Sequence, residues 1–425
     1  MKSPVLAFST IVESDGFRSL RDPWNALWAR LDRPQLFSTF DWCWNAWRLI
    51  AERRGHELRI VCGRLDGELV LIWPLMQDSG VLRMLSSETF EYRDVIVQPS
   101  EHAPRWVEDA WSHALETTQA TAFLFQNLRL PSVLAAKLAK MPHAQQIGGG
   151  WSSLIRLDRF ADWDAYANRL PKSLVSDQRR QWKRVREAIP ELSFRIVDNA
   201  DEIEPVIDWI SRHKEAWGEA RGKRGWFNAE DLQVMLKSVA KSALEDGRLV
   251  LATLSDGDKT LSAGWGYVCG GEFLFYAFAY DRAYATYSPS RLFLESLLRH
   301  CFRNGIRTFD FLPGDQPYKR LWATDYVQQA SYIGTLNWRG ELLLRLSRTN
   351  IISGLPDALR VVYRSLPDRW RRAVRGRLRS YRLVNYAVHL ELAPGPPAIA
   401  LAPAATSAMQ TNVRVGAANE ASPTP

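Results

Sequence analysis

Short apolar runs separated by turn signals follow the same order twice along the chain. In the first half, Asp66-Gly67 stands between two such runs and is typical of a tight β-hairpin. The elements predicted there are strands at 57–65, 68–76, 81–85, 92–97 and 121–128, with a helix at 105–118 before the last strand. In the second half, residues 255–258 (SDGD) and Gly270-Gly271 are the turn signals. The elements predicted there are strands at 248–254, 261–269, 272–280 and 306–312, with a helix at 288–305 before the last strand.

Helical apolar spacing also precedes each set of strands. These helices are expected at 23–31 and 41–54 in the first half and at 204–220 and 231–247 in the second. Each half therefore reads as helices followed by strand, strand, strand, helix, strand, and the first half has one further strand-like segment at 92–97. The repeat lies in the order of the elements, because the two halves share little sequence.

Composition adds limits on the class of protein. The chain has 425 residues, of which 46% are hydrophobic and 24% charged, as in an ordinary globular protein. Its apolar runs are shorter than the roughly 20 residues that cross a bilayer, and the N-terminus lacks the pattern of a secretory signal. We therefore expect a cytoplasmic protein. The four cysteines (Cys43, Cys62, Cys269, Cys301) are scattered and do not cluster with histidines, so we expect buried thiols and no metal site.

Positive charge is concentrated near the C-terminus. The segment from Arg345 to Arg382 holds eleven arginines and two acidic residues, a balance of +9, whereas the whole chain carries +8. The rest is therefore close to neutral, about −1, which argues against nucleic acid as a partner. The segment itself looks helical and amphipathic, although Pro356 and Pro367 interrupt it. It could lie on an anionic membrane surface or dock on a protein, and vesicle binding with and without it would separate the two.

The helix predicted at 288–305 has the best-defined ends. Ser288 is a suitable N-cap, Pro289 suits the first helical position, and Gly305 suits the C-terminal stop. A helix that follows directly after a buried strand presents free N–H groups to an anion such as a pyrophosphate. The same arrangement is also common in α/β proteins without a ligand. Arg282 and Arg291 are candidate phosphate contacts or solvated surface residues.

Residues 309–323 (FDFLPGDQPYKRLWA) combine a strand with a charged turn. Alternation places Thr308, Asp310 and Leu312 on one face, with Phe309 and Phe311 on the other. A carboxylate in a buried strand is costly unless it is paired, so Asp310 is either a general base or a structural partner of an arginine or backbone N–H groups. Beyond the Pro313-Gly314 break, the turn lies where ligands often bind in α/β folds.

Six stretches, in this order, resemble the CelD-like (cellulose-biosynthesis-type) acetyltransferases of the GNAT superfamily, which are similar to the Fem-type transferases. The matching stretches are 37–47 (FSTFDWCWNAW), 72–75 (IWPL), 92–94 (YRD), 176–184 (SDQRRQWKR), 287–295 (YSPSRLFLE) and 309–322 (FDFLPGDQPYKRLW). The resemblance covers about residues 35–340. It departs at Ser290, where the family often has glycine, the residue that allows the backbone to approach a phosphate most closely.

The resemblance implies an acyl-CoA site in the second half, with backbone N–H groups of the strand at 273–280 polarising the thioester. The donor-binding residues that it implies are Phe278, Ala279, Tyr280, Arg282, Tyr287, Ser288, Ser290 and Arg291. We expect Asp315 to be the acid/base on the acceptor side and Tyr318 to protonate the leaving thiolate, with Asp310 as the other candidate base. Acceptor contacts are assigned to Tyr92, Asp94, Lys319 and Trp322. Trp42, Trp44 and Trp47 could stack on a sugar, but their spacing favours a core.

The predicted fold is α+β: two tandem GNAT-like halves with mixed, mainly antiparallel sheets flanked by helices, followed by a basic helical segment. The expected boundaries are 1–160, 161–342 with the acyl-CoA site, 343–392 for the arginine-rich helices, and 393–425 as a disordered tail. The expected activity is acetyl or acyl transfer from CoA to an amine or hydroxyl, in polysaccharide or envelope biosynthesis. The alternatives are a Fem-like aminoacyl or peptidyl transferase and a non-catalytic binding protein with the same fold.

Overall fold

The computed structural model describes residues 5–85, 92–219, 227, 229–314 and 316–348. The strands before residue 160 are β1 (Ala7–Ile11), β2 (Glu57–Leu65), β3 (Glu68–Asp78), β4 (Val81–Met84), β5 (Ile96–Val97), β6 (Ala122–Arg129) and β7 (Ala144–Arg156). The helices there are α1 (Ser14–Ser19), α2 (Arg21–Ala29), α3 (Phe40–Ala46), which continues as a π-helical turn (Trp47–Ala51), α4 (Ala103–Thr117) and α5 (Val133–Leu138).

The second half repeats this mixture of elements. Its strands are β8 (Leu192–Ile196), β9 (Leu249–Asp256), β10 (Lys259–Cys269), β11 (Glu272–Tyr280), β12 (Thr308–Pro313) and β13 (Asp325–Thr335). Its helices are α6 (Trp163–Ala167), α7 (Lys172–Ala188), α8 (Ala200–Glu219), α9 (Glu230–Glu245), α10 (Pro289–Arg303), α11 (Pro317–Trp322) and α12 (Trp338–Arg348).

The described strands form one mixed sheet in the order β1-β2-β3-β4-β6-β13-β7-β12-β11-β10-β9-β8, with β5 paired to β3. Neighbours are antiparallel except β4 with β6 and β11 with β12. The predicted α+β class, with mainly antiparallel pairing and flanking helices, is confirmed.

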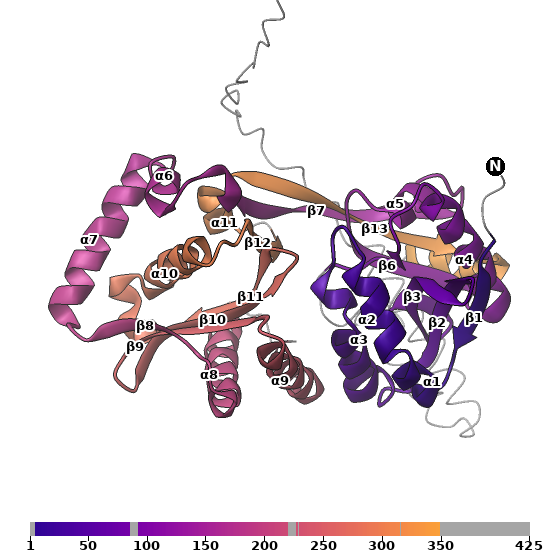
Figure 1. The fold of residues 1–425 in the computed structure, drawn as a ribbon, viewed down its shortest axis with the longest axis horizontal. Coiled ribbons are helices and arrows are strands. Elements are labelled where there is room, and N and C mark those ends of the chain that lie inside the picture. Colours follow the sequence, from indigo (N-terminus) through magenta and orange to yellow (C-terminus); the bar gives the residue numbers. More distant parts are fainter. Residues whose placement is uncertain (1–4, 86–91, 220–226, 228, 315, 349–425) are drawn as a thin grey trace, which may run out of the picture. The chain divides into compact units, whose positions relative to one another are not determined.

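Two long strands connect the two sets of strands (Figure 1). β7 pairs with β12 of the second half, and β13 pairs with β6 of the first half. β7 and β13 also pair with each other from Asp325 opposite Leu154 to Gly334 opposite Ala144. The sequence predicted separate sheets near 58–128 and 248–336. The structure differs because each half lends one strand to the other, so that the two sheets become continuous.

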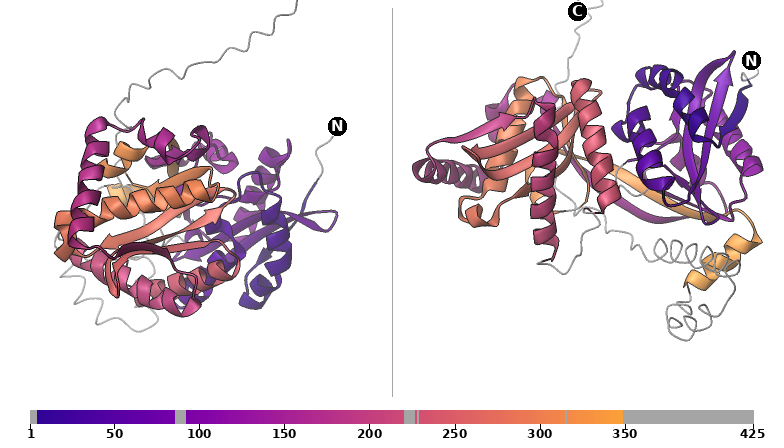
Figure 2. Two further views of the ribbon diagram at one scale, coloured as in Figure 1. Left: turned by 60° about the vertical axis from the view of Figure 1, so that its left-hand side comes forward. Right: turned by 90° about the horizontal axis from the view of Figure 1, so that it is seen from below.

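Helices cover both faces of each set of strands (Figures 1 and 2). Around β2 and β3, helices α1–α3 pack on one face and α4 and α5 on the other. In the second half, α6, α7 and α10 share a core with one face of β9–β12. Helices α8 and α9 pack on the opposite face, together with part of α3. The two cores of the second half therefore lie on opposite faces of β9–β12.

The sequence predicted turns and helix ends correctly where the backbone conformation requires a particular type of residue. Asp66 and Gly67 both have positive φ in the β2–β3 turn, as do Gly270 and Gly271 between β10 and β11. Helix α10 begins at Pro289 and is followed by Gly305 with positive φ, so the predicted boundaries are confirmed. Ser288, however, adopts the left-handed conformation and its side chain caps nothing. Its position as N-cap is right, but the expected side-chain cap is absent.

Several core expectations are also confirmed. Trp42, Trp44 and Trp47 are buried in the apolar cores, and all four cysteines are buried and unpaired. Burial raises the pKa of the Cys43, Cys62 and Cys269 thiols to about 12, which fits inert core residues. No helix within the described ranges combines the length and the apolar character that a membrane crossing requires. The arginine-rich segment beyond Arg348 and the tail from 393 lie outside the described residues, so these assignments stay predictions.

Candidate active site

The parallel strands β11 and β12 separate after a short stretch of pairing. Their ladder covers only Glu272 with Thr308, Phe273 with Phe309 and Leu274 with Asp310, although β11 continues to Tyr280 and β12 to Pro313. Beyond the last pair, no strand of the described residues pairs with this edge of β11. Backbone N–H and C=O groups that lack a ladder partner need another one, and a ligand is a suitable candidate.

A bulge sits on β11 at the start of this opening. Trp265 of β10 faces Ala277, whereas Gly266 faces Phe275, so Tyr276 is the extra residue. A Cβ at Gly266 would lie 2.3 Å from the carbonyl oxygen of Leu274, so only glycine allows this close approach. Bulges bend a strand and redirect its side chains, and they are frequent beside active sites.

A cavity of about 590 Å³ opens at the end of β11. Its walls come from β11, the start of α10, α8 and α11. Six of the eight predicted donor-binding residues line it: Phe278, Ala279, Tyr280, Arg282, Ser290 and Arg291. The predicted Tyr318 and Trp322 line it as well, whereas Tyr287 and Ser288 are not among its lining residues.

A second cavity, of about 240 Å³, lies on the side of β12. It is lined by Phe227, the residues 275–278 of β11, the residues 311–313 of β12, and Lys319. The two cavities share five lining residues: Lys214, Phe275, Phe278, Gln316 and Tyr318. They therefore meet at the opening between the two strands.

The N-terminus of α10 can receive an anion at the edge of the larger cavity. The N–H groups of Arg291 and Leu292 bond to the carbonyl of Ser288, whereas that of Ser290 has no acceptor among the described residues. Ser290 lies inside the helix and does not have positive φ, so serine is not strained where the resembling family often has glycine. Arg282 is exposed beside it, and the Arg291 guanidinium is paired with Asp177 of α7.

Tyr318 lies on α11 with its ring against Phe278 and Phe311, at centroid distances of 5.9 and 6.2 Å. Burial raises the pKa of its phenol well above the usual value, so the hydroxyl stays protonated at neutral pH. A protonated hydroxyl at the junction of two cavities can donate a proton to a leaving group.

Lys319 is buried and turned toward the backbone of β12. Its Nζ donates to the carbonyl oxygens of Phe311, Leu312 and Pro313 at 2.8, 3.1 and 3.2 Å. These three contacts use the three protons of an ammonium. The geometry thus favours a role in fixing the end of β12 over the predicted contact with substrate.

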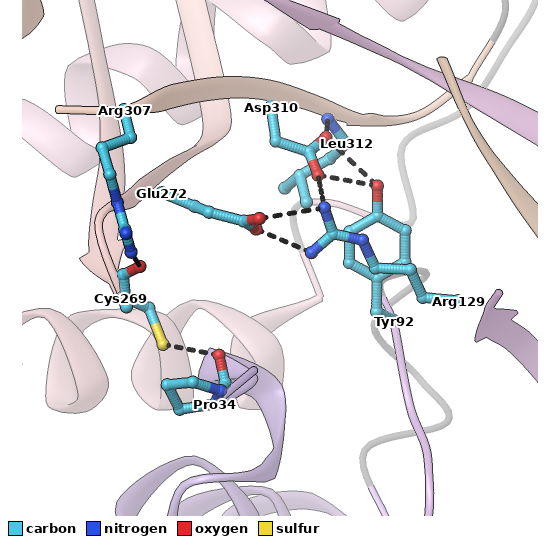
Figure 3. Close-up of polar contacts among 9 residues, drawn as sticks. Pro34, Tyr92, Arg129, Cys269, Glu272, Arg307, Asp310 and Leu312 are labelled. Atoms are coloured by element: carbon cyan, nitrogen blue, oxygen red, sulfur yellow. Dashed lines mark hydrogen bonds and ion pairs between the residues drawn. The ribbon is translucent and has the colours of Figure 1, made fainter. Parts of the chain in front are cut away.

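Asp310 lies away from both cavities, in a buried network that joins the two halves (Figure 3). Its carboxylate accepts hydrogen bonds from the Tyr92 hydroxyl at 2.9 Å and from the Leu312 N–H at 2.7 Å. Arg129 lies 3.4 Å from the same carboxylate, bonds to Glu272 at 2.7 Å, and covers the Tyr92 ring at 5.0 Å. Burial raises the pKa of Asp310 more than Arg129 lowers it. The structural alternative weighed for Asp310 therefore has the stronger support, and it extends to Tyr92.

The remaining predicted residues are dispersed. Asp94 precedes β5 and accepts a hydrogen bond from the N–H of Val95 at 2.8 Å. Burial raises the pKa of Asp94 to about 7, but the residue lines neither cavity. Asp315 lies outside the described residues, so its catalytic role stays a prediction.

Two residues, one in the cavity walls and one in the buried Asp310 network, carried no sequence signal. Lys214 occurs in the middle of an amphipathic helix, and only the packing of α8 on β11 brings it to the cavities. Arg129 ends a strand that reads as an ordinary core element, and its partners are 143 and 181 positions away at Glu272 and Asp310. Neither partnership is visible without the tertiary fold.

Part of the chain matches a known protein family. Residues 172–320, about a third of the chain, match the family model described as acetyltransferase (GNAT) domain. A search of curated proteins returned no match. A crystal structure of FemX is similar at a TM-score of 0.54 and 12% identity, over 80% of this chain and 99% of that one. At that identity the likeness concerns the fold alone.

Two further solved structures have lower scores. The C-terminal domain of a putative lysylphosphatidylglycerol synthetase from Agrobacterium fabrum has a TM-score of 0.47 at 14% identity, over 79% of this chain and 97% of that one. A tandem GNAT protein from the clavulanic acid biosynthesis pathway has 0.44 at 16% identity, over 78% and 99%. The CelD-like subgroup was not found and stays a prediction. Residues 172–320 are therefore similar to the GNAT acetyltransferase domain.

Proposed function

We propose that this chain transfers an acyl group from acyl-CoA to an amine or hydroxyl acceptor. The observation that carries the proposal is the meeting of the two cavities at the opening between β11 and β12. The donor would lie along the larger cavity with its pyrophosphate at the N-terminus of α10, where the Ser290 N–H and Arg282 are available. Acyl-CoA acts here as a co-substrate.

The chemistry asks little of side chains because a thioester is already activated. The acceptor nitrogen or oxygen forms a bond to the acyl carbon, the carbon–sulfur bond breaks, and the acceptor loses a proton while the thiolate gains one. Backbone N–H groups on the open edge of β11 are placed to polarise the carbonyl. Tyr318 is the described residue best suited to protonate the thiolate. The base on the acceptor side remains assigned to Asp315.

Calorimetric titration with acetyl-CoA tests the proposal. Ser290→Glu places a carboxylate at the proposed pyrophosphate site and should weaken binding at least tenfold, about 1.4 kcal/mol. Ser193→Glu adds the same charge on exposed residue 193 of β8, away from the cavity, and should bind like the wild type. Equal affinity of the folded Ser290→Glu protein would place the donor elsewhere.

The same titration separates the alternatives. A Fem-like aminoacyl or peptidyl transferase would leave acetyl-CoA unbound and would take its donor from charged tRNA, and a non-catalytic relative would release no CoA with any acceptor. Acetyl-CoA binding followed by CoA release supports the acyltransferase. A role in polysaccharide or envelope biosynthesis, transfer to N or to O, and a position at the membrane through Arg345–Arg382 belong to the proposal and rest on the sequence alone.

A further inference from the structure

Lys214 occupies the wall that the two cavities share. It projects from α8 and is half-buried, with its Nζ 4.9 Å from the ring centroid of Phe227. No carboxylate of the described residues forms an ion pair with it. It thus differs from Lys237 and Lys241 of the neighbouring helix α9, which pair with Asp208 and Glu204.

The lining of both cavities is positively charged. Among the described residues that line them there is no aspartate or glutamate, whereas the basic residues present are His213, Lys214, Arg282, Arg291 and Lys319. Phosphates of the donor would account for Arg282 and Arg291 at the α10 end. The protons of Lys319 are used by three backbone carbonyls. Lys214 is therefore the cation on the shared wall that neither the proposed pyrophosphate site nor the backbone carbonyls account for.

An ammonium in this position is costly without an anion. Burial lowers the pKa of Lys214 to about 8, and no charge from the described residues offsets that effect. A carboxylate or phosphate within hydrogen-bond distance would stabilise the charged form. The smaller cavity, with its volume of about 240 Å³, has room for such a group beside the reacting amine or hydroxyl.

We propose that the acceptor carries an acidic group, a carboxylate or a phosphate, which the Lys214 ammonium binds in the smaller cavity. The inference deepens the proposed acyl transfer and rests on it. Lys214 then selects the acceptor by charge, since a neutral analogue would leave its ammonium unpaired in the cavity. The residue acts as a binding group, and the acceptor proton leaves through a different base.

Paired acceptors test the charge requirement. CoA release from acetyl-CoA is measured with glycine against glycinamide and with glucosamine 6-phosphate against glucosamine, so that the two arms separate carboxylate from phosphate. In at least one arm the acidic member should have a kcat/KM about tenfold higher or more. Lys214→Met should abolish that preference, Lys214→Arg should retain it, and Lys259→Met, which alters an exposed lysine of β10, should leave it unchanged.

Each outcome bears on one proposal. If the neutral acceptor of each pair reacts as well as the acidic one, the proposal of an acidic acceptor is wrong, whereas the proposed acyl transfer still holds. Loss of turnover in both Lys214→Met and Lys214→Arg, with a pH dependence near 8 in the wild type, would make Lys214 the base and overturn its role in binding. Failure of acetyl-CoA to bind in calorimetry would count against the proposed function itself.

A second measurement needs no acceptor. Acetic anhydride labels lysines in the intact protein at a rate set by the free amine, and peptide mass spectrometry compares Lys214 with Lys259. Inorganic phosphate or acetate should slow the labelling of Lys214 at pH 8 severalfold and leave Lys259 unaffected, because a bound anion holds the ammonium form. Equal labelling of Lys214 with and without both anions would refute an anion site at this position.

Discussion

At the residue scale, Asp310 shows how one buried carboxylate can hold two halves of a chain together. Tyr92 and Arg129 reach it from the first half, and the Leu312 N–H reaches it from its own strand. Asparagine has a single oxygen and would turn its NH₂ group toward donors. Asp310→Asn should therefore lower the free energy of unfolding by about 1–3 kcal/mol, measured by urea denaturation, while turnover of the folded protein stays near the wild-type value.

Two controls accompany that variant. Tyr92→Phe removes one donor to the same carboxylate, so its effect should be smaller and should not add to that of Asp310→Asn. Asp208→Asn breaks a partly exposed pair with Lys237 and should cost about 1 kcal/mol or less. Loss of turnover at unchanged stability would instead make Asp310 catalytic.

The sequence placed residues together where they are close in the chain, but it did not predict the contacts between residues far apart in the chain. Six of the eight predicted donor-binding residues line one cavity because they lie in one short stretch, 278–291, whose strand-to-helix order already places them together, and their role in donor binding stays a prediction. Tyr92 was singled out as an acceptor contact and Asp310 as a general base or a structural partner, but their mutual hydrogen bond was not predicted because it spans 218 positions. Long-range pairing of this kind leaves no local pattern.

At the element scale, the end of β12 depends on Lys319 of α11. Its ammonium donates hydrogen bonds to three backbone carbonyls in the part of β12 that no longer pairs with β11. Leu312, in the same part, has positive φ. Lys319→Met should leave these carbonyls without donors and loosen the segment. Hydrogen–deuterium exchange should then rise about tenfold in residues 311–322, whereas α10 and its terminal-turn amides keep wild-type rates.

The matched control for that variant is Lys237→Met on α9. It makes the same substitution but removes an ion pair with Asp208 between two surface helices, so it should not change exchange in residues 311–322. Unchanged exchange in Lys319→Met would mean that the carbonyl contacts do not order β12, and would return Lys319 to the predicted substrate contact.

Elements differ in how readily their sequences reveal them. α10 was predictable because Pro289, Gly305 and its apolar stripe are local signals. β7 was not, since Gly148, Gly149 and Gly150 read as a loop, and its strand conformation comes from pairing with β12 and β13. The short strands β8 and β1 consist of exposed and half-buried residues. Their strand conformation likewise comes from pairing with β9 and β2.

At the scale of the whole molecule, the exchange of β7 and β13 makes the two halves interdependent. A fragment of residues 161–342 contains the region that matches the GNAT family but lacks β6 and β7, so β12 loses one neighbouring strand and β13 loses both. We expect this fragment to lack a cooperative thermal transition by circular dichroism. Residues 1–348 should keep one.

Cutting the chain without removing strands is the control. Residues 1–161 and 162–348, produced together, retain every pairing, because Ala161 and Asp162 are exposed and lie between β7 and α6. They should copurify as a complex with a melting transition like that of the uncut chain. Cooperative folding of residues 161–342 alone would show that the exchanged strands are dispensable.

The position of β13 also has a consequence during synthesis. β6 is complete at Arg129, but its neighbour begins pairing with it only at Gln329, two hundred residues later. At the usual pace of about 5–20 residues per second, the ribosome leaves that edge of the nascent first half uncovered for roughly 10–40 s. An uncovered edge strand is a template for intermolecular pairing. The nascent chain therefore has a defined window of aggregation risk, which closes when residues 329–335 leave the exit tunnel and join β6.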